Sequence, residues 1–390
     1  MKIIRQIINI AIRECRIMVF KNPIYLFCMV LLPIFVIIFF TTMMSEGQPL
    51  ELPVGIVDQD NTNTTRKLIR TLDSFQSSKV VAHYTNMNDA RAAIQRGEIY
   101  AFLLIPKGTT EGMVSGSQPK MSFYYNGVMM LAGSTTFRDL KTVSTLGSAG
   151  VGAAKLSAVG KTEREIQAFL QPITIDLHLI NNPWANYNVY LSTTMVPGLL
   201  MLFVFLITPY SIGTELKFGV AHTWMYMAKN NPMVAIAGKI LPQTLIFTTI
   251  FWGFEYYIYY VLGFPHPGGI IPILLLGLLA VLSAQCFGIF IFGLMPSLRM
   301  SMSVCSLWAM LSFSLSGATY PIFAMDTPIQ TVAWLFPLRH YYMIYQINIF
   351  NGYPLSYAWM HWAVLIAFLI LPAFIMRNLR HAMLEYRYIP

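Results

Sequence analysis

Charged residues are scarce in this sequence, and several long tracts contain none. Only 11% of the 390 residues are charged and 56% are apolar, whereas roughly 25% of an average soluble domain is charged. Tracts without Asp, Glu, Lys or Arg cover residues 22–45, 256–298, 300–325 and 340–376. Each is longer than the roughly 20 residues with which a helix crosses a bilayer. This scarcity excludes an ordinary soluble protein and predicts several membrane spans.

The motifs of self-contained enzymes are also absent. The sequence has no GxxxxGK[ST] loop to hold nucleotide phosphates, and no GxSxG, HExxH or CxxC. We therefore expect no ATP hydrolysis, no cofactor and no metal on this chain. No basic stripe with interleaved aromatic residues is present, which argues against nucleic acid as a partner. The four cysteines lie in or beside apolar tracts and are interpreted as small apolar residues: Cys15, Cys28, Cys286 and Cys305.

The uncharged tracts divide the chain into a membrane part and an insertion. Residues 23–45 are predicted to form a first transmembrane helix, 46–187 an inserted domain, 188–376 the other spans and 377–390 a tail. A cleaved signal peptide is disfavoured, because the apolar run after Pro23 is too long for one. Five further spans are expected at about 189–211, 240–262, 270–295, 301–323 and 357–376. The predicted fold is a membrane all-α bundle of six transmembrane helices with an inserted extracytoplasmic α/β domain.

Lys and Arg residues in the short flanks of the spans indicate the orientation. Residues 1–22 are predicted to form an amphipathic basic helix in the headgroup layer, with Ile4, Ile8 and Ile12 on its apolar face. If the N-terminus is cytoplasmic, twelve Lys and Arg residues lie on the inner side and only Arg339 lies in a short outer segment. The positive-inside rule then places both termini in the cytoplasm. The inserted domain follows the first span and is therefore expected outside the cytoplasm. Its own charges are not counted, because long segments are exempt from that rule.

The inserted domain alternates between strand and helix patterns. Strands are expected at 52–58, 79–84, 100–106 and 121–125, and helices at 64–75 and 89–96. Asn88 is the expected cap of the second helix, and residues 128–170 form one or two helices. Strands that alternate with helices indicate a small α/β domain.

One ionisable residue, Glu255, lies deep in a predicted span. A charge within a membrane costs roughly 2.5–3.5 kcal/mol on insertion scales, so the residue is a functional candidate. In the alternative interpretation, Glu255 lies near the outer interface and is hydrogen-bonded to neighbouring tyrosines. A proton-coupled carrier would depend on Glu255 alone.

Two connecting segments have unusual patterns. The inner loop 213–232 carries charges of both signs and has an amphipathic pattern that includes Trp224. We interpret it as a helix parallel to the membrane, through which a cytoplasmic partner could move two spans. The alternative is an ordinary solvated connection. The segment 324–350 is too broken by proline for a span and too apolar for a free loop. We interpret it as short re-entrant helices that line an exit, and the alternative is an interfacial aromatic belt.

These segments carry a resemblance to ABC type-2 permeases, the membrane subunits of a class of ABC exporters, along nearly the whole chain. Glu215 and Gly219 match the family's Glu-Arg-Glu-x-Gly-Thr element, although Leu216, Lys217 and Val220 depart from it. Gly238-Lys239 matches a Gly-Lys step at the start of the third span. The span-five signature is matched by Ser316-Gly317 through Pro321, and by Phe336-Pro337-Leu338 with Arg339 before Tyr341.

The resemblance implies a division of labour between subunits. A separate ABC ATPase would bind ATP and Mg²⁺ and contact the loop around Glu215, Lys217, Phe218, Gly219 and Trp224. Gly317, Pro321, Pro337, Leu338 and Arg339 would form the exit region. Such subunits pair with a second copy or a paralogue in the bacterial inner membrane, often beside a periplasmic adaptor, and export amphiphilic drugs or lipids. A membrane-anchored receptor or scaffold that transports nothing is the alternative function.

Overall fold

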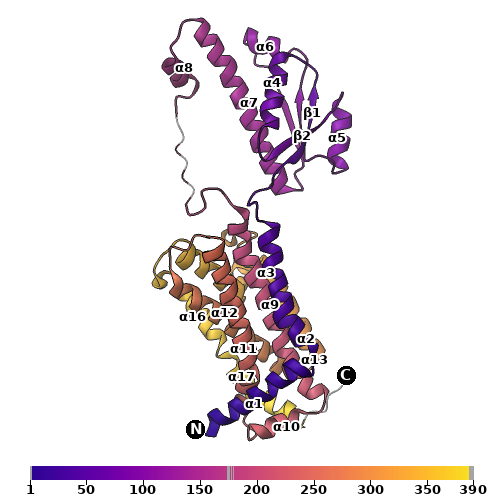
Figure 1. Ribbon diagram of the computed structural model, residues 1–390, viewed down its shortest axis with the longest axis vertical. Coiled ribbons are helices and arrows are strands. Elements are labelled where there is room, and N and C mark those ends of the chain that lie inside the picture. Colours follow the sequence, from indigo (N-terminus) through magenta and orange to yellow (C-terminus); the bar gives the residue numbers. More distant parts are fainter. Residues whose placement is uncertain (1, 174–175, 177, 179, 386–390) are drawn as a thin grey trace. The chain divides into compact units, whose positions relative to one another are not determined.

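The computed structural model describes residues 2–173, 176, 178 and 180–385. It divides into two compact units, one formed by Met1–Ser45 with Ile180–Pro390 and the other by Glu46–Leu179. The first unit is helical, and the second contains the sheet (Figure 1). The division after Ser45 falls where charged residues return in the sequence.

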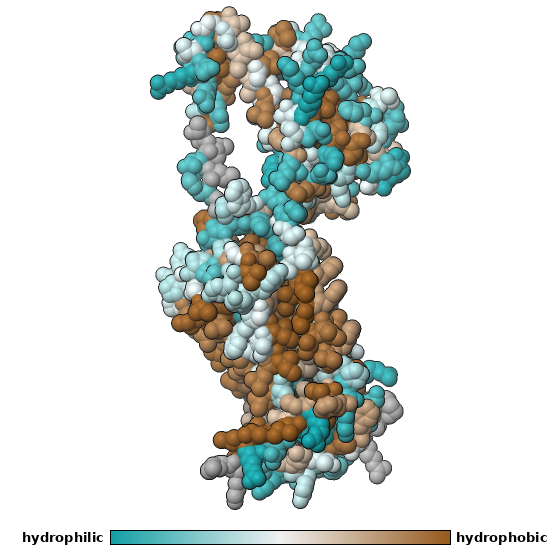
Figure 2. Space-filling view, viewed as in Figure 1, coloured by the Kyte–Doolittle hydropathy of each residue, from teal (hydrophilic) through white to brown (hydrophobic). Residues whose placement is uncertain are grey.

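Five helical segments of the described residues are long and apolar enough to cross a membrane. Figure 2 shows hydrophobic residues gathered over the middle of the helical unit, as expected for a lipid-facing belt. The chain is therefore a multi-pass membrane protein. The segments are Pro23–Met43 (α2, Pro23–Leu26; a π-helical turn, Phe27–Leu31; α3, Leu32–Met43), Tyr187–Lys217 (α9), Pro232–Val261 (α11, Pro232–Tyr256; a π-helical turn, Tyr257–Val261), Ile270–Leu294 (α12) and Leu355–Glu385 (a 3-10 turn, Leu355–Ala358; α16, Trp359–Phe368; α17, Leu371–Glu385).

The expected span at 301–323 is a shorter helix in the structure. Helix α13 covers Leu298–Ser314, only 17 residues, so the count of six spans stays a prediction. The helix ends because Gly317 has a φ of +97° and Pro321 follows. The chain then forms short helices, as expected for the proline-broken segment: a 3-10 turn at Ile322–Ala324, α14 at Thr327–Ala333, α15 at Pro337–Ile344 and a π-helical turn at Tyr345–Phe350.

Helix α1, Lys2–Phe20, packs against α11. Ile4, Ile8 and Ile12 are exposed, as expected for an apolar face in the headgroup layer. A second face, with Ile10, Glu14 and Met18 at the spacing i, i+4, i+8, is buried. The helix therefore has two contact faces, and the buried one contains an acidic residue.

The Glu46–Leu179 unit contains a four-stranded sheet in the order β2-β1-β3-β4. β1 pairs in parallel with β2 and β3, and β3 pairs antiparallel with β4. The four predicted strands are confirmed, with bounds at Leu52–Asp58 (β1), Ser78–His83 (β2), Ala101–Ile105 (β3) and Ser122–Tyr125 (β4).

Helices cover both faces of this sheet. Leu68 and Leu72 of α4 and Leu140 of α7 pack with β1 and β3 in one cluster, whereas Ala90 and Ala93 of α5 belong to a cluster on the other face. The helices are α4 (Asn63–Asp73), α5 (Met87–Gln95), α6 (Thr109–Ser115), α7 (Met130–Ala158) and α8 (Glu163–Leu170).

The expected cap of α5 is wrong. Asn86 caps the helix: its backbone is extended, and its Oδ1 atom accepts a hydrogen bond from the Asp89 N–H at 2.9 Å. Asn88 lies inside the first turn. Both asparagines precede the same apolar pattern, so only the backbone conformation distinguishes them.

Candidate functional site

A short helix, α10 (Ala221–Met227), connects α9 with α11. Helix α9 ends at Lys217, and Gly219 follows with a φ of +67°, a conformation that favours glycine. On the other side of α10, Asn231 caps α11 by accepting the Met233 N–H at 3.0 Å. The predicted inner loop is thus a helix between two tight turns, which gives it a defined position.

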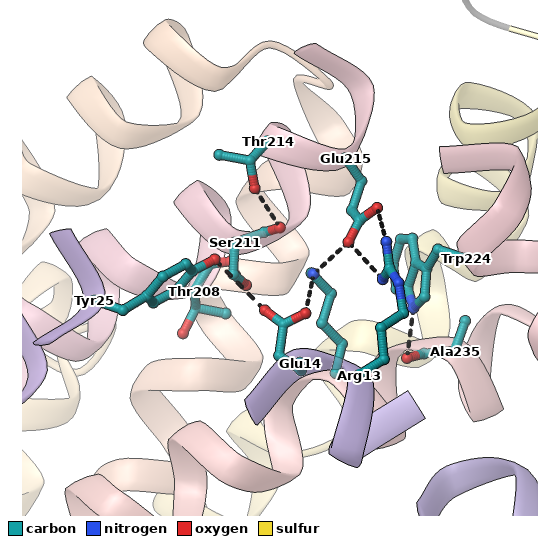
Figure 3. Close-up of polar contacts among 10 residues, drawn as sticks. Arg13, Glu14, Tyr25, Thr208, Ser211, Thr214, Glu215, Trp224 and Ala235 are labelled. Carbon is teal, nitrogen blue, oxygen red and sulfur yellow. Dashed lines mark hydrogen bonds and ion pairs between the residues drawn. The ribbon is translucent and has the colours of Figure 1, made fainter. Parts of the chain in front are cut away.

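A buried ion-pair network lies beside α10 and joins α1, α9 and α11. The Lys239 Nζ atom is 2.6 Å from Glu14 Oε2 and 2.7 Å from Glu215 Oε1. Arg13 donates two hydrogen bonds to the Glu215 carboxylate, at 2.8 and 2.9 Å, and Figure 3 shows the two groups facing each other. The side chains of Glu14, Lys239 and Glu215 are 0%, 1% and 3% exposed. We call these four residues the ion-pair network.

The network is electrically balanced, because two carboxylates face two cations. Burial raises the pKa of Glu14, which the nearby Lys239 ammonium opposes without outweighing. Burial lowers the pKa of Arg13, but the hydrogen bond and charge of Glu215 outweigh it, so the Arg13 pKa is raised. A buried charge that loses its partner costs about 3–5 kcal/mol. The four residues therefore depend on one another's positions.

Trp224 attaches α10 to this network. Its side chain is fully buried, and the Lys239 ammonium lies 5.4 Å from the centre of the indole ring, within range of a cation–π interaction. The indole Nε1 donates to the Ala235 carbonyl of α11 at 3.2 Å (Figure 3). A displacement of α10 would therefore disturb contacts to α11 and to Lys239.

The predicted contact residues of this loop divide into two groups. Glu215 and Trp224 are buried, whereas Lys217, Phe218 and Gly219 are exposed. A cavity of about 570 Å³ opens beside them, between the end of α1 and the end of α9. Its wall includes Arg13, Lys21, Glu215, Lys217 and Phe218. The exposed group is available to a partner, and the buried group connects it to the helices.

The sequence alone does not single out Arg13, Glu14 or Lys239 as members of one site. Two signals were present in the sequence: Glu14 is the only acid among residues 1–22, and Lys239 stands at the start of a span. Lys239 lies just before the predicted span at 240–262, but it belongs to the long apolar segment Pro232–Val261 and is buried. Glu255 is therefore not the only buried charged residue of that segment.

The residues of the predicted exit region gather around α15. A Cβ atom on Gly317 would lie 3.1 Å from Ile322 Cγ1 and 3.8 Å from Tyr342 Cε1, so this turn packs against α15. Pro337 begins α15, Leu338 is buried, and Pro321 directly precedes Ile322.

Arg339 is also buried, with its guanidinium 5.8 Å from the centre of the Trp334 ring. Its Nε and Nη1 atoms have no hydrogen-bond partner within the described part of the chain. Beside it, His340 Nδ1 lies 2.9 Å from His361 Nδ1. Of the signature residues, Pro337, Leu338 and Arg339 are thus buried in α15 and Gly317 lies beside it, whereas Pro321 is exposed.

Glu255 is 2% exposed, and neither carboxyl oxygen has a hydrogen-bond partner among the residues that the structure describes. The alternative in which neighbouring tyrosines hydrogen-bond this carboxyl is therefore wrong.

A family model described as ABC-2 family transporter protein matches residues 23–376. The match includes α9, α10 and α11, and it begins after α1. No curated protein matches the chain significantly.

Proposed function

Because the chain belongs to the ABC-2 transporter family, we propose that it is the transmembrane (permease) subunit of an ATP-binding cassette exporter. Family membership implies an ABC ATPase as the partner. The cargo in this proposal is an amphiphilic small molecule, drug or lipid, moved out of the cytoplasm or the inner leaflet. ATP and Mg²⁺ would be bound by the partner and supply the energy.

The observation that carries the proposal is the connection from an exposed surface to three long helices. Phe218, in the turn before α10, is 69% exposed, and Tyr226, near the end of α10, is 80% exposed; we call residues 218–227 the α10 segment. Between them, Trp224 is buried against α11 and Lys239. Protein–protein interfaces are enriched in aromatic side chains, which often supply their anchors. A partner bound there would hold α10 directly.

The ion-pair network makes α10 a suitable lever. If the partner moves α10, Trp224 pulls on α11, and Lys239 transmits the displacement to Glu215 of α9 and Glu14 of α1. The helices must follow, because separation would leave buried charges without partners. A partner whose binding differs between two arrangements of the helices then shifts their populations.

Several further features belong to the same proposal. We place the chain in a bacterial inner membrane, with α1, α10 and the C-terminal tail in the cytoplasm and the Glu46–Leu179 unit outside. The positive-inside count supports this orientation. A second permease copy or a paralogue would complete the path, and a periplasmic adaptor would extend it across the envelope.

Co-purification with the ATPase tests the proposal. We expect the tagged chain, isolated from its own host in mild detergent, to retain an ABC ATPase subunit with ATPase activity. Phe218→Ala and Tyr226→Ala should each lower the amount recovered at least about tenfold, as loss of an interface anchor does. Tyr353→Ala is the matched control, since Tyr353 is 55% exposed and lies outside the α10 segment.

The receptor or scaffold alternative makes the opposite prediction. If the chain is a receptor or scaffold, no ATPase should co-purify with the unmodified chain. Deletion of 215–225 and replacement of Glu215 should abolish the complex if the chain is a permease. A complex that survives both changes would refute the coupling role.

A further inference from the structure

The Glu255 carboxyl is buried, and neither of its oxygens has a hydrogen-bond partner among the described residues. Glu255 belongs to the last turn of α11, directly before the π-helical turn Tyr257–Val261. An ionised carboxylate without donors is costly at this depth, so the site requires a positive partner whenever the group is ionised.

Three aromatic side chains lie in the neighbourhood of this carboxyl. A Cβ atom on Gly277 of α12 would lie 2.8 Å from Glu255 Oε2 and 3.1 Å from Trp252 Cδ1, so the carboxyl and the indole meet over that glycine. Tyr259 follows Glu255 by about one helical turn, and the Tyr341 ring lies 6.0 Å from the ring of Phe251, which precedes Glu255 by one turn. The two tyrosines are 3% and 2% exposed. The site thus combines one carboxyl group with three aromatic side chains.

Trp252 separates this site from the surface of the helical unit. Its side chain is 39% exposed, and its Nε1 donates to the Leu274 carbonyl of α12 at 3.1 Å. Gly277 of α12 presents no side chain there. The indole is thus partly exposed at the surface and also lies close to the carboxyl.

We propose that Glu255, with Trp252, Tyr259 and Tyr341, binds the positively charged group of a lipophilic organic cation. The inference rests on the proposed function, since the cation would be the cargo or one class of it. Aromatic faces attract organic cations, and the buried carboxylate supplies the counter-charge. The apolar part of the ligand would lie against α11 and α12.

A metal ion fits the site less well. Hard cations are held by about six oxygen ligands, and one carboxylate supplies two. No group of three or more His, Cys, Asp or Glu residues suited to a metal occurs in the described ranges. The aromatic walls favour an organic cation instead.

Equilibrium dialysis of tetraphenylphosphonium against the purified full chain in detergent, corrected with protein-free micelles, tests the inference. We expect saturable binding to the unmodified chain and a dissociation constant at least about tenfold higher for Glu255→Gln, which keeps the size of the side chain and removes the charge. A neutral tetraphenyl compound should bind both forms equally. Equal tetraphenylphosphonium binding by both forms, or none by the unmodified chain, would overturn the inference.

Two glycine variants give a second test. Gly277→Ala places a Cβ 2.8 Å from Glu255 Oε2 and should displace the carboxyl and weaken binding. Gly253→Ala, on the same helix as Glu255, meets no atom within 4 Å and should leave binding unchanged. Equal effects of the two variants on binding would contradict the inference. This test does not depend on whether the Glu255→Gln variant folds.

The ATPase co-purification described above separates this inference from the proposed function. A Glu255→Gln chain that retains its ATPase and still binds the cation equally refutes only the cation site. An unmodified chain that retains no ATPase refutes the exporter, whatever it binds.

Discussion

Lys239 shows how much can depend on one side chain. It lies within 2.7 Å of an oxygen of each of two buried carboxylates, one on α1 and one on α9, and it faces the indole of α10. Glu215 has a second cation in Arg13, but the other contact of Glu14 is a hydroxyl, Tyr25 at 3.5 Å. Loss of the ammonium would therefore leave the buried Glu14 carboxylate without its ion-pair partner.

At this scale we predict that Lys239→Met lowers the free energy of unfolding by about 3–5 kcal/mol. The loss should be seen as a lower midpoint of thermal unfolding in detergent. Adding Glu14→Gln to Lys239→Met should recover part of it, because the orphaned charge is removed. Lys217→Met, at an exposed position of the same loop, is the control. Additive losses in the double variant would contradict the coupling.

Among the elements, the contact of α1 with α11 depends on a close approach. A Cβ atom on Gly238 would lie 2.7 Å from Ile10 Cβ and 2.9 Å from the Ile7 carbonyl oxygen. Small residues allow such approaches between helices. The Gly-Lys pair at the start of α11 thus has two roles, since Gly238 admits α1 and Lys239 then reaches Glu14.

We predict that Gly238→Ala separates α1 from α11 and costs about 1–3 kcal/mol, as over-packing does. The backbone oxygen of Ile7 cannot move aside as a flexible side chain would. The midpoint of thermal unfolding in detergent should fall, and the recovered ATPase should fall with it. Gly253→Ala on the same helix, which meets no neighbour within 4 Å, should change neither. An unaltered midpoint in Gly238→Ala would show that α1 docks without this contact.

Across the whole molecule, the two units have separate cores. The sheet of the Glu46–Leu179 unit buries its apolar residues against α4, α5 and α7, and none of the described residues of the helical unit belongs to these clusters. A unit with its own core can fold by itself. The membrane helices would then anchor the Glu46–Leu179 unit to the membrane without contributing to its folding stability.

We therefore predict that residues 46–179, expressed alone, fold into a soluble α/β domain. Far-ultraviolet circular dichroism should show mixed helix and strand, with one cooperative thermal transition. Leu103→Asp is a suitable negative control, because Leu103 is 1% exposed in the core and a buried unpaired charge should abolish the transition. A gradual, non-cooperative melt of the unmodified fragment would contradict independent folding.

The sequence by itself determined the features that depend on local pattern. Uncharged tracts revealed the long membrane helices, and alternation with turn residues revealed all four strands, because hydropathy and backbone preference act over a few residues. Helix ends were less well determined: Asn86 rather than Asn88 caps α5, and α13 stops at Ser314.

Only the tertiary structure decided which charges meet. Arg13 and Glu215 are 202 residues apart in the sequence, and Glu14 and Lys239 are 225 apart, so no local pattern could join them. The surroundings of Glu255 also depend on the tertiary structure. The tyrosines near it in the sequence suggested hydrogen bonds to its carboxyl, but in the packed helices no described residue makes one. Burial and pairing of charge are properties of the packed helices, because the free energy of a charge depends on what surrounds it in space.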